Sequence, residues 1–163
     1  MVLIRKASLN NFSIIISLWK EFMKNHDEIV IKKNKTLKDY IARKKAAQNN
    51  YKKFVEEHIK SGIGVVYIAE INDSPVGFTL TYIKDEIPIF KIEKIGYVSD
   101  LFVKEEFRGM GISSKLMEKS IQWLTKKNIR HVSLGLYSDN EIAHTIYKKW
   151  DFFDYKIEMR KKI

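Results

Sequence analysis

The chain has 163 residues, of which 45% are hydrophobic and 12% aromatic, so it is long and apolar enough to bury one core. The absence of cysteine excludes disulfides and thiolate metal sites, and the four histidines lack paired spacing, so no metal site is predicted. The formal net charge of +10 is spread over lysines along the whole chain, and no segment approaches the roughly 20 apolar residues of a membrane span.

The first third of the sequence changes from an alternating pattern to a helical one. Residues 2–8 alternate and predict a strand, and Asn11 can cap a helix over residues 12–25 with apolar side chains on one stripe. A second helical region begins at Thr36 and runs to residue 60. It is either one helix or two helices broken near Asn49 and Asn50.

The apolar period then becomes two, which predicts strands. Residues 64–71 and 75–84 form a hairpin across a short Asn-Asp-Ser link, and residues 97–103 form a further strand. The segment 84–90 between them is a loop or a frayed edge, because Pro88 cannot donate to a strand ladder.

The last third alternates between helix and strand. A long helix follows Gly111, residues 131–138 form a strand, Asn140 caps a helix over residues 141–150, and residues 152–161 form a final strand. The predicted order is β-α-α-β-β-β-α-β-α-β. It describes one α/β domain over residues 1–163 with a mixed sheet.

Two glycines one residue apart, Gly109 and Gly111, lie between a predicted strand and a predicted helix. A helix N-terminus presents unpaired N–H groups and a partial positive charge, and a backbone without side chains lets a phosphate reach them. Arg108 adds a permanent cation. The alternative is a tight helix entry that binds no ligand.

Two common phosphate loops do not fit this segment. The dinucleotide fingerprint requires a third glycine where Ser114 stands, and the nucleoside-triphosphate loop requires a Gly-Lys-Ser/Thr sequence that is absent.

A third pattern fits. Residues Glu106 to Gly111 resemble motif A of the GNAT superfamily of N-acetyltransferases, whose signature is Gln/Arg-x-x-Gly-x-Gly/Ala. The family's downstream Asn, Ala and Tyr are matched by Asn140, Ala143 and Tyr147, and the order of elements also agrees. The resemblance covers essentially the whole chain. It implies a central mixed, mostly antiparallel sheet flanked by helices.

The resemblance also implies a site for acetyl-CoA. The pyrophosphate would lie on backbone N–H groups after the strand, the pantetheine arm along the strand edge, and Tyr147 would protonate the departing thiolate as the catalytic acid. The implied cofactor-binding residues are Leu101, Phe102, Val103, Arg108, Gly109, Met110, Gly111, Ile112, Ser113, Asn140 and Tyr147.

The sequence departs from the family at three positions. Glu106 replaces a Gln or Arg, Asp151 stands where glycine is usual, and Gly135 occupies the position of a glutamate found in acetylases of protein N-termini. The general base therefore stays unassigned. Asp100 and Glu70 are candidates, and each has an equally good structural explanation. Tyr147 can be a core residue and Asn140 a simple helix cap.

The sequence thus predicts an acetyl-CoA-dependent N-acetyltransferase that is cytoplasmic and needs no metal. Its expected partners are acetyl-CoA and an amine acceptor (a small molecule, a polyamine, or a peptide or lysine), with no nucleic acid and no membrane; a homodimer is compatible with the sequence. The acceptor site should be lined by the first two helices and the loop that contains Asp85 and Glu86. The alternative is a non-catalytic acyl-CoA-binding or regulatory module, and a nucleic-acid-binding role rests on net charge alone.

Overall fold

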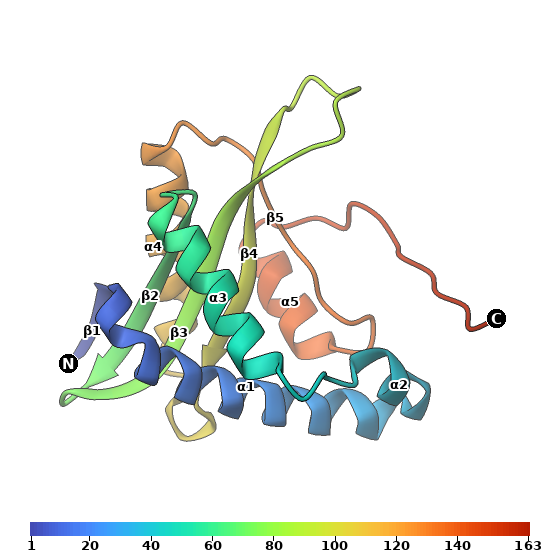
Figure 1. The fold of residues 1–163 in the computed structure, drawn as a ribbon, viewed down its shortest axis with the longest axis horizontal. Coiled ribbons are helices and arrows are strands. Elements are labelled where there is room, and N and C mark those ends of the chain that lie inside the picture. Colours follow the sequence, from blue (N-terminus) through green and yellow to red (C-terminus); the bar gives the residue numbers. More distant parts are fainter.

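Five strands form one sheet in the computed structural model, which describes residues 1–163. They lie in the order β1-β2-β3-β4-β5, and all neighbours are antiparallel except β4 and β5, which are parallel (Figure 1). The predicted mixed, mostly antiparallel sheet is therefore confirmed. The strands are β1 (Val2–Lys6), β2 (Gly64–Ile71), β3 (Ser74–Asp85), β4 (Lys94–Val103) and β5 (Val132–Leu134).

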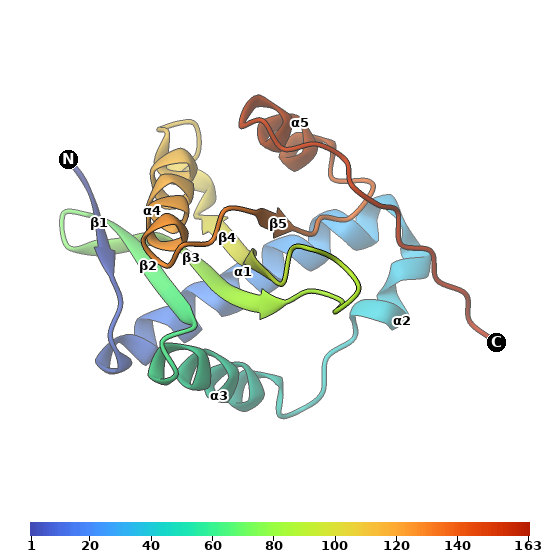
Figure 2. The same ribbon diagram turned by 90° about the horizontal axis from the view of Figure 1, so that it is seen from above.

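Helices cover both faces of this sheet, as Figure 2 shows most clearly. The main core packs α1 and α3 against one face, and a second cluster packs α4 against the other. The helices are α1 (Phe12–Lys33), α2 (Lys38–Ile41), α3 (Ala47–Lys60), α4 (Ile112–Lys126) and α5 (Glu141–Lys149), with short 3-10 turns at Leu9–Asn11, Lys35–Leu37 and Glu105–Phe107.

The second helical region is two helices, but its break lies at residues 42–46 rather than near Asn49 and Asn50. Arg43 in this break forms an ion pair with Asp27 of α1, which ties the connection to the first helix. A pattern of weak apolar spacing could not reveal a break that depends on a partner in another helix.

The β2–β3 hairpin closes as predicted. Asn72 and Asp73 have φ angles of 49° and 61°, so both occupy the left-handed region that a two-residue type I′ turn requires. Asparagine and aspartate tolerate this region better than other residues with a side chain.

A bulge in β4 changes which side chains face which helices. Leu80 pairs with Asp100 and Thr81 pairs with Val98, so Ser99 is the extra residue. Before the bulge, Gly96 faces α4, where an added Cβ would collide with Leu124. After it, Asp100 faces α3. The bulge thus places a carboxylate on the face that α1 and α3 cover.

The parallel pairing of β4 with β5 ends at the same place. It runs only from Gly96 opposite Val132 to Val98 opposite Leu134. From Asp100 to Val103, β4 pairs with β3 alone. The sheet therefore opens along one side of β4, directly before the glycine segment.

The predicted final strand over residues 152–161 is wrong. No residue after α5 belongs to a strand, and the alternating side chains of Phe153, Tyr155 and Ile157 are at least 74% exposed. The alternation that suggested a strand is present, but β5 is only three residues long and offers little edge to pair with. The strand predicted at residues 131–138 is correspondingly reduced to Val132–Leu134.

No helix of the structure is both long enough and apolar enough to cross a membrane.

Candidate active site

The glycine segment turns sharply between β4 and α4. Gly109 and Gly111 have φ angles of 78° and 72°, in the left-handed region that favours glycine. A Cβ added at either position would meet no atom within 4 Å. The backbone conformation therefore favours glycine at both positions, and the space in front of them is open to a ligand.

The backbone N–H groups from Gly109 to Ser114 donate no hydrogen bond within the chain. The first turn of α4 contains no acidic residue, and Gly111 at its N-cap has no side chain to satisfy these donors. Together with the partial positive charge of a helix start, they make a site for an anion. This is the segment for which the sequence predicts pyrophosphate binding.

Arg108 holds this turn in place. Its Nε donates to the carbonyl of Val103 at 3.1 Å, and Nη2 donates to Oδ1 of Asn25 in α1 at 2.9 Å. The guanidinium therefore links the end of β4, the turn and α1. Glu106, the departure from the family pattern, lies exposed in the preceding 3-10 turn.

The edge of β4 that would hold the pantetheine arm comes directly before this turn. The N–H of Lys104 donates to the carbonyl of Val76 in β3, so the backbone N–H of residue 104 points toward β3. Because the peptide groups of successive residues alternate in direction, those of Leu101 and Val103 face away from β3, toward the side where β5 has ended. The peptide groups of Phe102 point toward β3. Its side chain is buried in the α1–α3 core.

Asp100 is the only buried acid in the protein, with 7% of its surface exposed. The hydroxyl of Tyr51 in α3 donates to its Oδ2 at 2.8 Å. Burial raises the pKa of Asp100 to about 6, although hydrogen bonds from Tyr51 and Ser99 partly oppose this shift. Hydrogen bonds from Tyr51 and Ser99 thus hold the carboxylate at the point where β4 and β5 separate.

The Tyr97 hydroxyl lies beside Gly135, the position at which acetylases of protein N-termini carry a glutamate. A Cβ built on Gly135 would be 3.1 Å from the Tyr97 hydroxyl, so this phenol occupies the space beside residue 135. Burial and the charge of Asp100 raise the pKa of Tyr97, which keeps the phenol protonated at neutral pH. Neither Tyr97 nor Tyr51 was predicted as a site residue from the sequence. Only the fold brings Tyr97 beside Gly135 and Tyr51 beside Asp100.

Helix α5 carries the other two predicted site residues. Oδ1 of Asn140 accepts from the N–H of Ala143 at 3.2 Å, so Asn140 caps the helix as predicted. Tyr147 is half-buried, and its ring packs edge-on against Trp150 and Phe152, each at 5.8 Å between centroids. Burial raises the pKa of Tyr147. In both views α5 lies on the β5 side of β4 (Figures 1 and 2).

The end of α5 explains how an aspartate replaces the usual glycine. Asp151 has a φ angle of 62°, and its N–H donates to the carbonyl of Lys148 while Phe152 donates to that of Tyr147. This pair of bonds is the Schellman motif, whose left-handed position normally takes glycine.

Two of the other acids named from the sequence, Glu70 and Asp85, form ion pairs. Glu70 forms a bidentate ion pair with Arg5, at 2.7 Å from Nη2. Asp85 forms an exposed pair with Lys94 at 2.6 Å. No group of three His, Cys, Asp or Glu side chains is arranged to hold a metal ion.

A model of the acetyltransferase (GNAT) family matches residues 32–152. An uncharacterized N-acetyltransferase of Archaeoglobus fulgidus is 31% identical over 132 residues, which cover 81% of this chain and 87% of that protein. The chain belongs to the GNAT family.

Two further similarities agree with this assignment. An N-alpha-acetyltransferase of Sulfurisphaera tokodaii is 28% identical over 64% of this chain and 65% of its own length. The crystal structure of a predicted acetyltransferase of Clostridium acetobutylicum with acetyl-CoA has the same fold, with a TM-score of 0.79 and 18% identity over 99% of this chain and 96% of that one. The predictions of a GNAT fold and of an enzyme that transfers acetyl groups to amines are confirmed.

Proposed function

We propose that this GNAT domain binds acetyl-CoA with its pyrophosphate on the N–H groups of residues 109–114 and its pantetheine arm along β4 beyond Val98. One observation carries this proposal. The half of β4 that lacks β5 as a neighbour leads within a few residues into a turn whose N–H groups have no partner. An amide-bearing arm can pair with such an edge as an added strand does, while the helix start receives the anion.

Within this site the proposed role of Arg108 is to hold the strand edge and the turn in a fixed arrangement. Its bonds to Val103 and Asn25 fix the distance between the strand edge and the turn, so that one extended molecule can contact both. Arg108 also adds a cation directly before the turn in the sequence, and the first turn of α4 adds no opposing carboxylate.

The transfer forms one bond and breaks another. The amine nitrogen attacks the thioester carbonyl carbon, a C–N bond replaces the C–S bond, and the sulfur leaves as a thiolate that takes up a proton. Tyr147 is the proposed proton donor. Its phenol is protonated at neutral pH, because the ordinary pKa of a phenol is about 10 and burial raises the pKa of Tyr147 further.

The amine nitrogen must lose a proton, and Asp100 is the proposed acceptor. It is the one buried carboxylate, it lies at the bulge where β4 and β5 separate, and a pKa of about 6 leaves it mostly ionised at neutral pH. Tyr51 holds its Oδ2 by a hydrogen bond, so the carboxylate has a fixed orientation.

The acceptor is proposed to be a primary amine that approaches past Tyr97. The ammonium of Lys84 already lies 4.4 Å from the centroid of the Tyr97 ring, a cation–π contact that an incoming amine can reproduce. The Tyr97 hydroxyl fills the space beside Gly135. An acetylation that depends on a glutamate at that position is therefore not expected.

An acetylation screen tests this function. The protein is incubated with acetyl-CoA and with polyamines, aminoglycosides, lysine peptides or peptide N-termini, and release of the free thiol is measured together with the mass of the amine. We expect thiol release that depends on at least one amine and an acetyl group on that amine. Tight binding of acetyl-CoA with no acetylated amine in any class would favour the non-catalytic acyl-CoA-binding module.

A further inference from the structure

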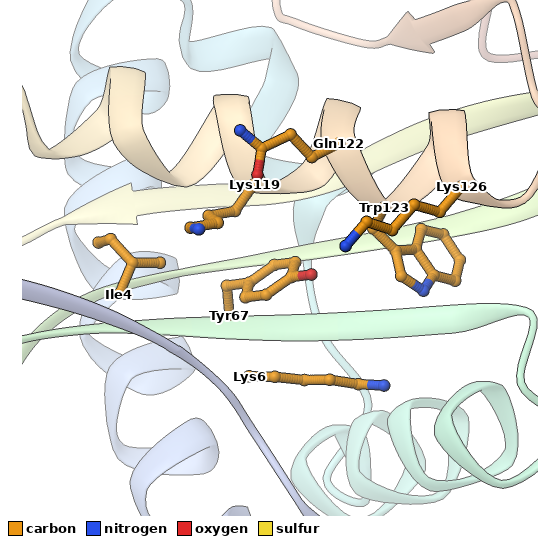
Figure 3. Close-up of a pocket in the computed structure, with 7 residues that line it drawn as sticks. All are labelled: Ile4, Lys6, Tyr67, Lys119, Gln122, Trp123 and Lys126. Atoms are coloured by element: carbon orange, nitrogen blue, oxygen red, sulfur yellow. The ribbon is translucent and has the colours of Figure 1, made fainter.

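A cavity lies on the other side of the sheet from the α1–α3 core. It has a volume of about 420 Å3 and lies between α4 and strands β1 and β2 (Figure 3). This volume is within the range of small-molecule sites. Its nearest helical residue, Lys119, is eight positions after Gly111, which corresponds to about 12 Å along a helix. The cavity is therefore separate from the glycine turn.

Helix period and strand register bring its polar side chains together. Lys119, Gln122 and Lys126 are spaced three and four residues apart, so they share one face of α4. Lys6 and Tyr67 are directly opposite each other in the β1–β2 pair, so their side chains project to the same face of the sheet. Figure 3 shows Lys119 and Lys126 reaching from α4 toward these strand residues.

The charge in the cavity is uncompensated. Lys6, Lys119 and Lys126 contribute three ammonium groups, and no carboxylate lines the cavity. None of these lysines takes part in an ion pair within 4 Å. The nearby acid of β2, Glu70, is neutralised by Arg5.

The other polar groups of the cavity can donate as well. Tyr67 is half-buried, and burial raises its pKa, so its hydroxyl keeps its proton. Neither this hydroxyl nor the amide of Gln122 has a hydrogen-bond partner among the side chains and backbone of the protein. Trp123 supplies an apolar wall and is 8% exposed.

We propose that this cavity is a second binding site, for a small anion that carries two or more phosphate groups. Ammonium and phenol donors without a carboxylate select an anion, and several cations within one small volume select a multivalent one. The concave shape between a helix and two strands favours a small molecule over the extended backbone of a nucleic acid. Inorganic polyphosphate and nucleoside polyphosphates share this chemistry.

The test uses inorganic tripolyphosphate and ATP as probes, with acetyl-CoA present at saturation so that the glycine turn is occupied. Binding is followed by calorimetry and by the NMR signal of the Trp123 indole N–H, identified with Trp123→Phe. We expect both the heat and the Trp123 shift to saturate. A stronger response to ATP than to tripolyphosphate would indicate that the nucleoside also binds. An equal response to the two probes would indicate that the phosphates are sufficient.

Two matched variants test whether the cavity lysines are responsible for this binding. Lys119→Gln/Lys126→Gln removes two exposed cavity lysines and should weaken binding about tenfold or more, the effect of losing charge-assisted hydrogen bonds. Lys44→Gln/Lys45→Gln removes two exposed lysines before α3 and should change affinity by less than about twofold. Equal losses in both variants, no shift of Trp123, or a Trp123 response to duplex DNA but not to either probe would each overturn the proposal.

Discussion

Replacing Asp100 with asparagine should make the protein more stable at neutral pH. The folded state raises the pKa of this carboxyl to about 6, against roughly 4 for an unfolded aspartate. Between these values the folded state binds more protons than the unfolded state, so this group's contribution to stability falls as pH rises from about 4 to about 6 and is then constant. Above pH 6 the ionised, buried carboxylate lowers the free energy of unfolding.

The magnitude follows from the shift. About two pKa units at about 1.4 kcal/mol each give roughly 3 kcal/mol at pH 7.5 as an upper limit. Asparagine, like the protonated acid, keeps an oxygen that can accept from Tyr51, and the pKa of about 6 already includes the bond to the ionised form, so this bond adds no separate cost. We therefore expect Asp100→Asn to gain at most about 3 kcal/mol at pH 7.5. The gain should vanish near pH 4.

Urea unfolding of the wild type and the variant at several pH values between 4 and 8 measures this difference. Asp85→Asn is the matched control, because Asp85 is an exposed carboxylate in a surface pair with Lys94, and its effect should stay within about 0.5 kcal/mol. A variant less stable than the wild type at pH 7.5, or a difference that does not change with pH, would refute the reasoning. If Asp100 also accepts the proton of the amine, the more stable variant will have lost turnover.

Four further results are expected. Gly111→Glu should abolish acetyl-CoA binding by calorimetry, whereas Gly62→Glu, at a φ angle of 73° outside the site, should impose a similar backbone strain and leave binding intact. Tyr147→Phe should keep stability and acetyl-CoA affinity but lower kcat by about 10²–10⁴-fold, and a wild-type kcat where chemistry limits the rate would remove Tyr147 from the mechanism. Asp151→Gly should raise the free energy of unfolding by about 1 kcal/mol, because glycine adopts its φ of 62° without strain, and an unchanged melting curve would contradict this. Binding to duplex DNA should be weak and should vanish by about 0.2 M salt, and sequence-selective binding above that salt would contradict the enzyme-only interpretation.

Local patterns were sufficient for the parts of the fold that depend on neighbouring residues. The Asn72–Asp73 turn, the cap at Asn140 and the glycine entry to α4 all follow from the preferences of single residues for particular backbone angles. The glycine motif and the downstream Asn-Ala-Tyr spacing also identified the family, because both are short and lie in fixed register.

The rest depends on contacts between distant parts of the chain. The extra residue at Ser99 reverses the direction of Asp100, and no alternation in the β4 sequence announces it. The proximity of the Tyr97 hydroxyl to Gly135 is created by the parallel pairing of β4 with β5. For the predicted last strand, the sequence pattern indicated an element that the fold does not form. Alternation alone does not make a strand when the neighbouring strand is short.

The most direct test of the proposed acetyl-CoA site is hydrogen–deuterium exchange with and without saturating acetyl-CoA. The N–H groups of residues 109–114 have no partner in the free protein and should exchange quickly. We expect acetyl-CoA to protect this segment together with residues 99–103 of β4, and Gly111→Glu to remove both effects. Saturating acetyl-CoA that leaves exchange in both segments unchanged would contradict the proposed site.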